Sequence, residues 1–208
     1  MNRIIKLAAI ISLILAAVNS FAVAPAQVPA TGETGTVADS KSGVAWPSPR
    51  FVAGSGDAAD CITDNLTGLM WPKNAIIGFT TASGGAPIAQ PKYDNITANL
   101  NTMSWSNALT AVARMNSAQS KLCGYSDWRL PNKVELKSMI NYGASNPAAW
   151  LNLNAQGFSN VQANNYCSSS TKAGSTDDAW LVNFNDGSVS ARLKINSYYY
   201  VWPVRLGQ

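Results

Sequence analysis

The 208-residue sequence contains no histidine, and this absence removes several classes of enzyme. Catalytic Ser-His-Asp and Cys-His arrangements require an imidazole, as do His-ligated zinc, non-haem iron and haem sites. The three cysteines include no Cys-x-x-Cys pair and are too few for an all-cysteine zinc site. We therefore expect a protein that is not an enzyme and that binds no cofactor.

Charged residues are also scarce, at 12% of the chain, with 15 Lys+Arg against 11 Asp+Glu. Two of the basic residues, Arg3 and Lys6, lie in an N-terminal segment that we expect to be removed, so the mature excess is 13 − 11 = +2. This excess is too small to indicate nucleic acid as a partner. The chain is rich in uncharged polar and small residues, as is typical of exported bacterial proteins.

The first 22 residues have the pattern of a secretory signal peptide. Residues 1–6 are short and basic, residues 7–18 are apolar, and Ser20-Phe21-Ala22 places small residues at the two positions that a signal peptidase reads. A membrane anchor is the alternative, but the apolar run is shorter than the ~20 residues that cross a bilayer, and no later segment is apolar enough to cross as a helix. We expect a mature protein in the periplasm, on the outer surface or secreted, where disulfides form.

The rest of the chain divides into a linker and one domain. Residues 23–46 are rich in Pro, Gly, Ala and Thr and have no apolar period, so we predict a disordered linker, which could also serve as a tether. Residues 47–208 are long enough to bury a core and form the folded domain. Within that domain the composition of residues 73–101 predicts a long surface loop or an insertion.

Two helices are predicted in the middle of the domain. The first begins after an N-cap at Ser104, and its apolar face is formed by Trp105, Ala108, Leu109, Val112 and Met115. The second follows Pro131, where Asn132 and Glu135 form a capping-box pattern, and it ends at Gly143.

Strands are predicted on both sides of these helices. Asp64-Asn65 forms a turn that leads into a strand ending at Trp71. In the last third, residues 180–184 alternate, Asn185-Asp186-Gly187 is a hairpin turn, and the next strand places Val189, Ala191 and Leu193 on one side. Residues 198–204 form a further strand, with Pro203 at an edge or bulge. The order predicts an α+β domain with two helices and a C-terminal antiparallel sheet of hairpins.

Three segments together resemble a known family. They are residues 64–71 (Asp-Asn-Leu-Thr-Gly-Leu-Met-Trp), residues 122–132 with Glu135-Leu136, and residues 179–187 with residues 201–205. From about residue 50 to residue 205 the sequence is similar to the Lcl C-terminal domain, the C-terminal domain of the Legionella collagen-like adhesin. The resemblance implies a C-type-lectin-like fold. The named relative is implicated in adhesion to sulfated polysaccharides, a role that also depends on a collagen-like stalk and trimer, and this sequence contains no Gly-X-Y tract.

The resemblance also implies a disulfide between Cys61 and Cys123. Both lie at segments that match the family's pattern, whereas Cys167 stands where relatives usually carry tryptophan in a Tyr-Trp-Ser-Ser segment. We therefore expect Cys167 to be a free thiol, buried as a small hydrophobe. Its presence argues against a ligand role for residues 166–169.

Three segments that contain acidic residues could hold a ligand, but each has a simpler structural interpretation. Arg129, within Asp127-Trp128-Arg129, could bind an anionic sugar. We favour a structural role in which Asp127 caps a turn, Trp128 enters the core and Arg129 pairs with a carboxylate. Asp177-Asp178 and Asn185-Asp186 could supply oxygens to calcium, but their spacing is not that of an EF-hand, and ordinary turn chemistry explains them. We expect no metal site.

The remaining candidates for ligand binding are basic and aromatic. Arg192 and Lys194 share the side of their strand opposite Val189 and Leu193, and Tyr199 follows closely. Lys133 and Lys137 form a second basic row on the second helix. Aromatic rings stack on sugars, and these cations attract sulfate or carboxylate groups. We expect a non-catalytic binding module for a polysaccharide or a surface protein. The alternative is a structural or interaction component of a cell-envelope assembly without carbohydrate affinity.

Overall fold

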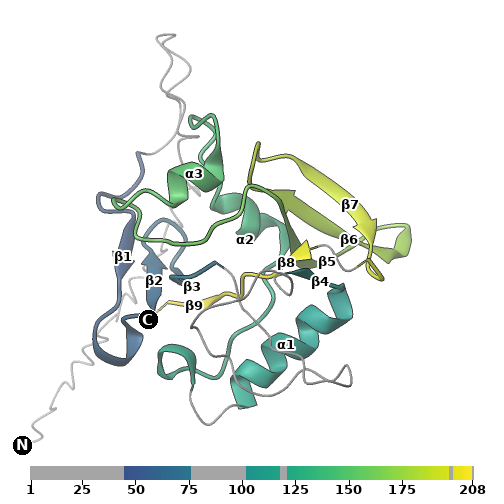
Figure 1. The fold of residues 1–208 in the computed structure, drawn as a ribbon, viewed down its shortest axis with the longest axis horizontal. Helices are drawn as coiled ribbons and strands as arrows, with labels where there is room; N and C mark the ends of the chain where they lie inside the picture. The colour runs from purple at the N-terminus through teal and green to yellow at the C-terminus, as the bar shows by residue number, and fades with distance from the viewer. Residues whose placement is uncertain (1–44, 76–101, 118–120, 197–198, 208) are drawn as a thin grey trace, which may run out of the picture.

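The computed structural model describes residues 45–75, 102–117, 121–196 and 199–207 (Figure 1). The predicted signal peptide, nearly all of the predicted linker and most of the predicted loop at 73–101 lie outside these residues. Among the described residues, the Trp46 ring centroid lies 5.7 Å from that of Trp150. The end of the predicted linker therefore packs against the domain.

The domain is α+β, as predicted, and the described residues form two sheets. The first sheet is antiparallel, has the order β1-β2-β3-β9 and consists of β1 (Phe51–Ala53), β2 (Cys61–Asp64), β3 (Leu69–Pro72) and β9 (Arg205–Leu206). The second has the order β4-β8-β5-β6-β7 and consists of β4 (Thr102–Met103), β8 (Tyr199–Tyr200), β5 (Asn165–Lys172), β6 (Ser175–Asn183) and β7 (Val189–Leu193). In this second sheet β5 and β8 pair in parallel, and the other neighbours are antiparallel.

Three α-helices and two short 3₁₀ helices connect the described strands. They are η2 (Gly56–Ala58), α1 (Trp105–Ser117), η3 (Leu122–Gly124), α2 (Lys133–Ser138) and α3 (Pro147–Leu151). The predicted N-cap of α1 is present, because Ser104 Oγ accepts the N–H of Asn107 at 3.4 Å. The predicted capping box of Asn132 and Glu135 is also present in α2.

Two details of the helix prediction were wrong. The helix α2 ends at Ser138 rather than at Gly143, because the N–H groups of Met139 and Ile140 bond to carbonyls three residues back and tighten its last turn. The helix α3 was missed, although Asn146 caps it and Pro147 occupies its first turn, the positions that these residues favour.

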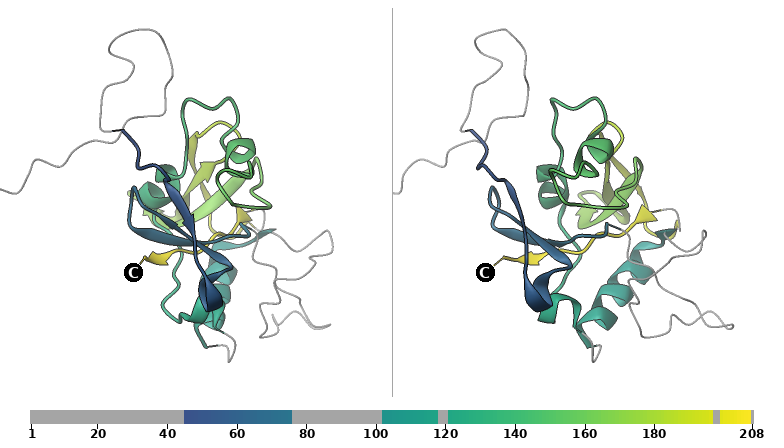
Figure 2. Two further views of the ribbon diagram at one scale, coloured as in Figure 1. Left: turned by 90° about the vertical axis from the view of Figure 1, so that its left-hand side faces the viewer. Right: turned by 60° about the vertical axis from the view of Figure 1, so that its left-hand side comes forward.

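The centre of the five-stranded sheet, at β5 and β6, is buried on both sides. On β5, Tyr166 faces a core cluster that includes α2 and α3, whereas Cys167 faces a second cluster that includes α1. On β6, Val182 faces the first of these clusters and Leu181 faces the second. The predicted alternation of buried and exposed positions therefore fails at Leu181. In each view α1 lies apart from α2 and α3 (Figures 1 and 2). The predicted apolar face of α1 is also too wide, since Leu109 is 38% exposed.

The predicted strand at residues 198–204 is two strands in different sheets. β8 ends at Tyr200, residues 201–203 are buried between the sheets, and β9 begins at Arg205. Trp202 Nε1 donates to the Pro72 carbonyl at 3.0 Å, and Val204 forms an isolated bridge with Arg129. Pro203 therefore lies at the crossing, where the chain leaves one sheet for the other.

The structure contains the predicted disulfide between Cys61 on β2 and Cys123 in η3, with Cα atoms 6.3 Å apart. Cys167 is a free, buried thiol, also as predicted. All three cysteines belong to the core cluster that α1 covers. The disulfide ties the first sheet to the segment that precedes α2.

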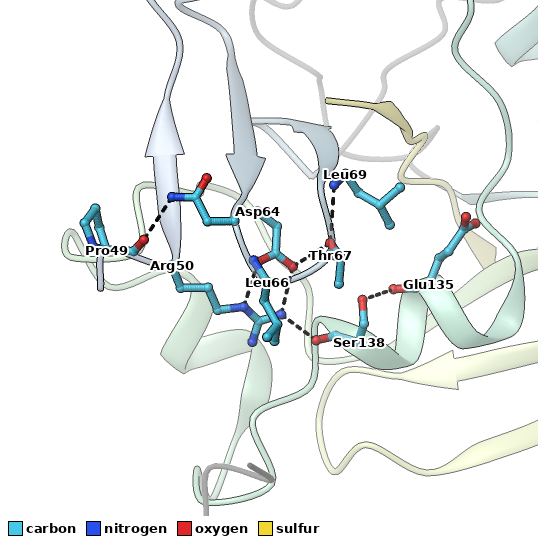
Figure 3. Close-up of polar contacts among 9 residues, drawn as sticks. Pro49, Arg50, Asp64, Leu66, Thr67, Leu69, Glu135 and Ser138 are labelled. Carbon is cyan, nitrogen blue, oxygen red and sulfur yellow. Dashed lines mark hydrogen bonds and ion pairs between the residues drawn. The ribbon is translucent and has the colours of Figure 1, made fainter. Parts of the chain in front are cut away.

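A buried ion pair joins β1 to the hairpin of β2 and β3 (Figure 3). Arg50 Nε and Nη2 each donate to a carboxylate oxygen of Asp64 at 2.9 Å, and Nη2 also donates to the Ser138 carbonyl at 2.6 Å. Asp64 in turn accepts the Leu66 N–H and the Thr67 hydroxyl. The pair thus fixes the 64–68 turn and, through Ser138, the C-terminal end of α2. The Asp-Asn-Leu-Thr-Gly segment singled out by the sequence is the turn built around this carboxylate.

We predict that Asp64→Asn lowers the free energy of unfolding by about 3–5 kcal/mol, because Arg50 would remain buried without a counter-charge. Urea titration followed by tryptophan fluorescence measures the change. Asp60→Asn, at an exposed carboxylate just before β2, is the matched control and should cost less than about 0.5 kcal/mol. A loss below 1 kcal/mol for Asp64→Asn would contradict the central structural role of the pair.

Replacing both Cys61 and Cys123 with alanine should lower the free energy of unfolding by about 4 kcal/mol. The bond spans a sequence separation of 62 and restricts the unfolded chain. In the parent protein one thiol should react with a labelling reagent, and only after unfolding. A non-reducing peptide map that links Cys167 to either partner would refute the pairing.

Candidate functional site

The structure divides the five residues predicted to bind a ligand among three environments. Lys133 and Lys137 lie on α2, on one side of the five-stranded sheet. In the β6–β7 register Arg192 is opposite Ala179 and Ser190 is opposite Leu181. Paired side chains point to the same side of a sheet, and Leu181 belongs to the cluster that α1 covers. Arg192 and Lys194 therefore lie on the α1 side. Tyr199 is buried in the core on that same side. The five residues therefore do not form one surface.

On the α2 side, each lysine lies over an aromatic ring. Lys133 Nζ is 4.3 Å from the centroid of a Trp180 ring, and Lys137 Nζ is 5.9 Å from the centroid of Tyr142. The two lysines are four residues apart on α2, which separates their backbone positions by about 6 Å along the helix axis. We call Lys133, Lys137, Tyr142 and Trp180 the lysine–aromatic face. It presents two cations in a row beside two half-exposed rings.

Backbone contacts hold this face in place at its N-terminal end. The Lys133 N–H donates to Ser170 Oγ at 3.0 Å, and the Ser169 N–H donates to the Pro131 carbonyl at 2.7 Å. These bonds attach the start of α2 to β5, the neighbour of β6. Trp180, on β6, is opposite Ala191 of β7. The first lysine–aromatic pair is therefore assembled from a helix and a strand far apart in sequence.

The hairpin turn between β6 and β7 positions Tyr142. Gly187 adopts φ +74°, and a Cβ atom there would lie 2.8 Å from Ile140 and 3.0 Å from the Tyr142 ring. Only glycine combines that conformation with this close approach. The Asn-Asp-Gly signal thus predicted the turn correctly, and the same glycine lets the Tyr142 ring pack beside it.

Glu135 supports the face from within α2. Arg129 donates to both of its oxygens at 2.7 and 2.6 Å, and the Asn132 N–H donates to Oε2 at 2.8 Å. Burial raises the pKa of Glu135, but the hydrogen bonds from Arg129 and Asn132, with the Arg129 charge, outweigh burial and leave the pKa below its ordinary value. Arg129 thus pairs with a carboxylate, as predicted.

The interpretation of Asp127-Trp128-Arg129 was otherwise right for Trp128 and wrong for Asp127. Trp128 is buried in the core. In the described structure the Asp127 carboxylate accepts from Arg205 at 2.7 and 3.2 Å instead of capping a turn, and these hydrogen bonds lower the pKa of Asp127. The Arg205 guanidinium is also 3.5 Å from the Tyr125 centroid. These contacts join β9 to the segment before α2 and have a structural role.

On the α1 side, Lys194 is already engaged. Its Nζ donates to Thr171 Oγ1 and to the Thr176 carbonyl, both at 2.8 Å, and lies 4.3 Å from the centroid of Trp105. Tyr199 donates its hydroxyl to the Leu193 carbonyl. The Tyr200 ring lies on the other side of the sheet, 5.4 Å from Tyr166, and Tyr198 lies outside the described residues. The rings near these cations are packed rather than free to stack on a sugar.

The two acidic segments considered for calcium lie at opposite ends of β6. Asp178 accepts from Ser175 Oγ at 2.9 Å, and Asp186 accepts the Ser188 N–H at 2.9 Å. A strand of this length separates them by roughly 20 Å. In the described part of the chain, no three acidic or cysteine side chains gather as a metal site would require.

Cys167 and its neighbours offer no activated nucleophile. Burial raises the pKa of the Cys167 thiol to about 12, so the thiolate is scarce at neutral pH. Ser168 Oγ donates to the Trp180 carbonyl at 2.7 Å and accepts the Ser170 N–H. Both groups are part of the packing of β5.

Substitutions at Glu135 should separate its two roles. Glu135→Gln keeps an oxygen for the Asn132 N–H and removes the ion pair, so we expect a loss below about 1 kcal/mol, whereas Glu135→Ala removes both and should cost about 1–2 kcal/mol. Because the folded-state pKa of Glu135 is lowered, its charge stabilises above pH 4.5, the ordinary value, and this contribution is lost as the pH falls through the folded pKa. Urea titrations at pH 7 and pH 3 should therefore show the parent losing its advantage over Glu135→Gln. An advantage that is constant with pH would contradict the ion pair.

Comparison with known proteins identifies the family. Among the described residues no helix is both long and apolar enough to cross a membrane. No curated protein matches the chain. The model of the Lcl C-terminal domain matches residues 60–205, well over half of the sequence and all of β2 to β8. This family is not a known enzyme family, and it indicates a non-catalytic, adhesin-like domain. The chain belongs to the Lcl C-terminal domain family.

Proposed function

We propose that this protein is an exported, non-catalytic binding module that recognises an anionic polysaccharide through the lysine–aromatic face. The single observation that carries the proposal is the pairing of Lys133 with Trp180 and of Lys137 with Tyr142 along one side of α2. We also propose a C-type-lectin-like arrangement of the domain, which family membership supports.

The chemistry of this face suits a charged sugar polymer. Apolar faces of sugar rings stack on aromatic side chains, and ammonium groups attract sulfate or carboxylate substituents. Within the described part of the chain, neither Lys133 nor Lys137 has a carboxylate within ion-pair distance. Their charges are therefore available to a ligand. Two cations in a row fit a polymer that carries a negative group on successive units.

Export is supported by two observations of different kinds. The N-terminal sequence has the pattern of a signal peptide, and the domain contains a disulfide, which persists in oxidising compartments. An exported domain of this type would meet polysaccharides at the cell surface or in the surrounding matrix.

Two charge-matched double variants test which side of the sheet binds. Lys133→Gln/Lys137→Gln and Arg192→Gln/Lys194→Gln each remove two positive charges, on opposite sides. We expect the first to lower affinity for immobilised heparin, a sulfated polysaccharide, by about tenfold or more at low salt, and the second to change it less than twofold. Elution salt and surface plasmon resonance measure the difference, and thermal unfolding verifies that each variant is folded.

Equal loss in both variants would indicate non-specific attraction to charge. Loss confined to Arg192→Gln/Lys194→Gln would place the site on the α1 side. Absence of binding by the parent to heparin and to a broad glycan array, with co-purification of envelope proteins, would favour the structural or interaction role instead.

A further inference from the structure

The apolar side chains of β7 become more exposed toward the C-terminal end of the strand. Val189, Ala191 and Leu193 share this side, and Ile195 follows beyond the end of the strand. Val189 packs against the core and Ala191 is half-buried, but Leu193 is 50% exposed and Ile195 is 80% exposed, the most of any large apolar side chain in the described residues. Packing on this side therefore covers only its beginning, and in the described structure the last two aliphatic side chains project into solvent.

The backbone holds these side chains outward. The Lys194 N–H donates to the Asp177 carbonyl at 2.8 Å, and the Trp105 N–H donates to the Lys194 carbonyl at 3.0 Å. The Asn196 N–H donates to the Leu193 carbonyl at 3.2 Å, which turns the chain back immediately after Ile195. The backbone around Ile195 is therefore hydrogen-bonded both to β6 and to the start of α1, and this holds the Ile195 side chain in its exposed position.

Cations alternate with the aliphatic side chains at this position. We call Arg192, Leu193, Lys194 and Ile195 the β7 tip. Lys194 is held by Thr171, Thr176 and Trp105, whereas Arg192 bonds only to the carbonyl of Ala191 in the described structure. The carboxylate of Asp178, opposite Leu193 in the register, lies 4.0 Å from Lys172 Nζ. Asp177 is the other nearby carboxylate, and the tip keeps a net positive charge.

We propose that the β7 tip docks on an anionic lipid surface, with Leu193 and Ile195 entering the interfacial region and Arg192 contacting headgroup phosphates. Exposed aliphatic side chains beside cations are the combination that binds peripheral proteins to anionic membranes. A stable protein interface requires about 800 Å² per partner, which the narrow end of one edge strand does not provide. Leu193 lies on the same side of the sheet as Trp180, one position beyond Ala191 on that side, whereas Arg192 lies on the α1 side. The proposal rests on different residues from those of the lysine–aromatic face, so variants can test the two separately.

Sedimentation with vesicles tests the proposal. The mature protein is mixed with vesicles of phosphatidylcholine containing phosphatidylglycerol, or of phosphatidylcholine alone. We expect binding to the anionic vesicles that falls about tenfold in Ile195→Ser and about fivefold at low salt in Arg192→Gln. Val134→Ser is the matched control, because Val134 is an exposed aliphatic residue on α2, 69% exposed, and its replacement should leave vesicle binding unchanged.

Further variants distinguish this site from the proposed polysaccharide site. The tenfold effect of Ile195→Ser should persist in the Lys133→Gln/Lys137→Gln background, and heparin affinity should be unchanged in Ile195→Ser. Failure of the parent to bind anionic vesicles, or binding that Ile195→Ser does not reduce, would overturn the proposal. Self-association that Ile195→Ser abolishes, seen by analytical ultracentrifugation without vesicle binding, would overturn it in favour of a second copy of this chain.

Discussion

The Arg50–Asp64 ion pair is the interaction on which the arrangement of this domain depends. It is fully enclosed, and it joins the first strand, the turn of the next hairpin and the C-terminal carbonyl of α2 at Ser138. The Arg50 guanidinium also lies 4.5 Å from the centroid of Trp46 and 4.6 Å from that of Phe51. Since removing one partner leaves a buried charge, the two residues form an interdependent unit. The start of the domain and the helix that carries Lys133 and Lys137 are fixed by the same side chain.

The six-residue helix α2 illustrates why such anchoring matters. An isolated helix of this length is unstable in water, because nucleation is costly and few hydrogen bonds are gained. Here Asn132 and Glu135 satisfy its first N–H groups, Ser170 attaches it to β5, and Arg50 binds Ser138 at the other end, where a cation also suits the helix dipole. A short helix that is fixed at both ends can hold two lysines at a defined spacing over aromatic rings.

The sequence predicted the features that depend on local chemistry. The capping box of α2, the Asn185-Asp186-Gly187 turn and the N-cap at Ser104 each follow from a few adjacent residues whose hydrogen bonds are local. The pairing of Cys61 with Cys123 came from family resemblance and was confirmed. Features that depend on tertiary contacts were missed or misplaced. Leu181 is buried because α1 covers a side of the sheet that the alternating pattern assigns to solvent, and the strand at residues 198–204 is divided between two sheets.

The candidate site follows the same division. Lys133 and Lys137 were identified from their helical spacing, but Trp180 was placed only in an alternating strand. Its contact with Lys133 joins elements that no local pattern connects. Arg192 and Lys194 were grouped with Tyr199 because they are close in sequence. The structure buries Tyr199 and engages Lys194 with Thr171 and Thr176. Proximity in sequence was therefore a poor guide to which residues share a surface.

Ligand binding along α2, beside Trp180 and Tyr142, is the proposed activity of this domain. An NMR titration of the isotopically labelled domain with a size-defined heparin oligosaccharide tests it most directly, because amide and indole signals report each residue separately. We expect saturable shifts at Lys133, Lys137 and Tyr142 and at the Trp180 indole N–H, with little change on the α1 side. Shifts confined to Arg192, Lys194 and Trp105, or no saturable shifts at any residue, would contradict this proposal.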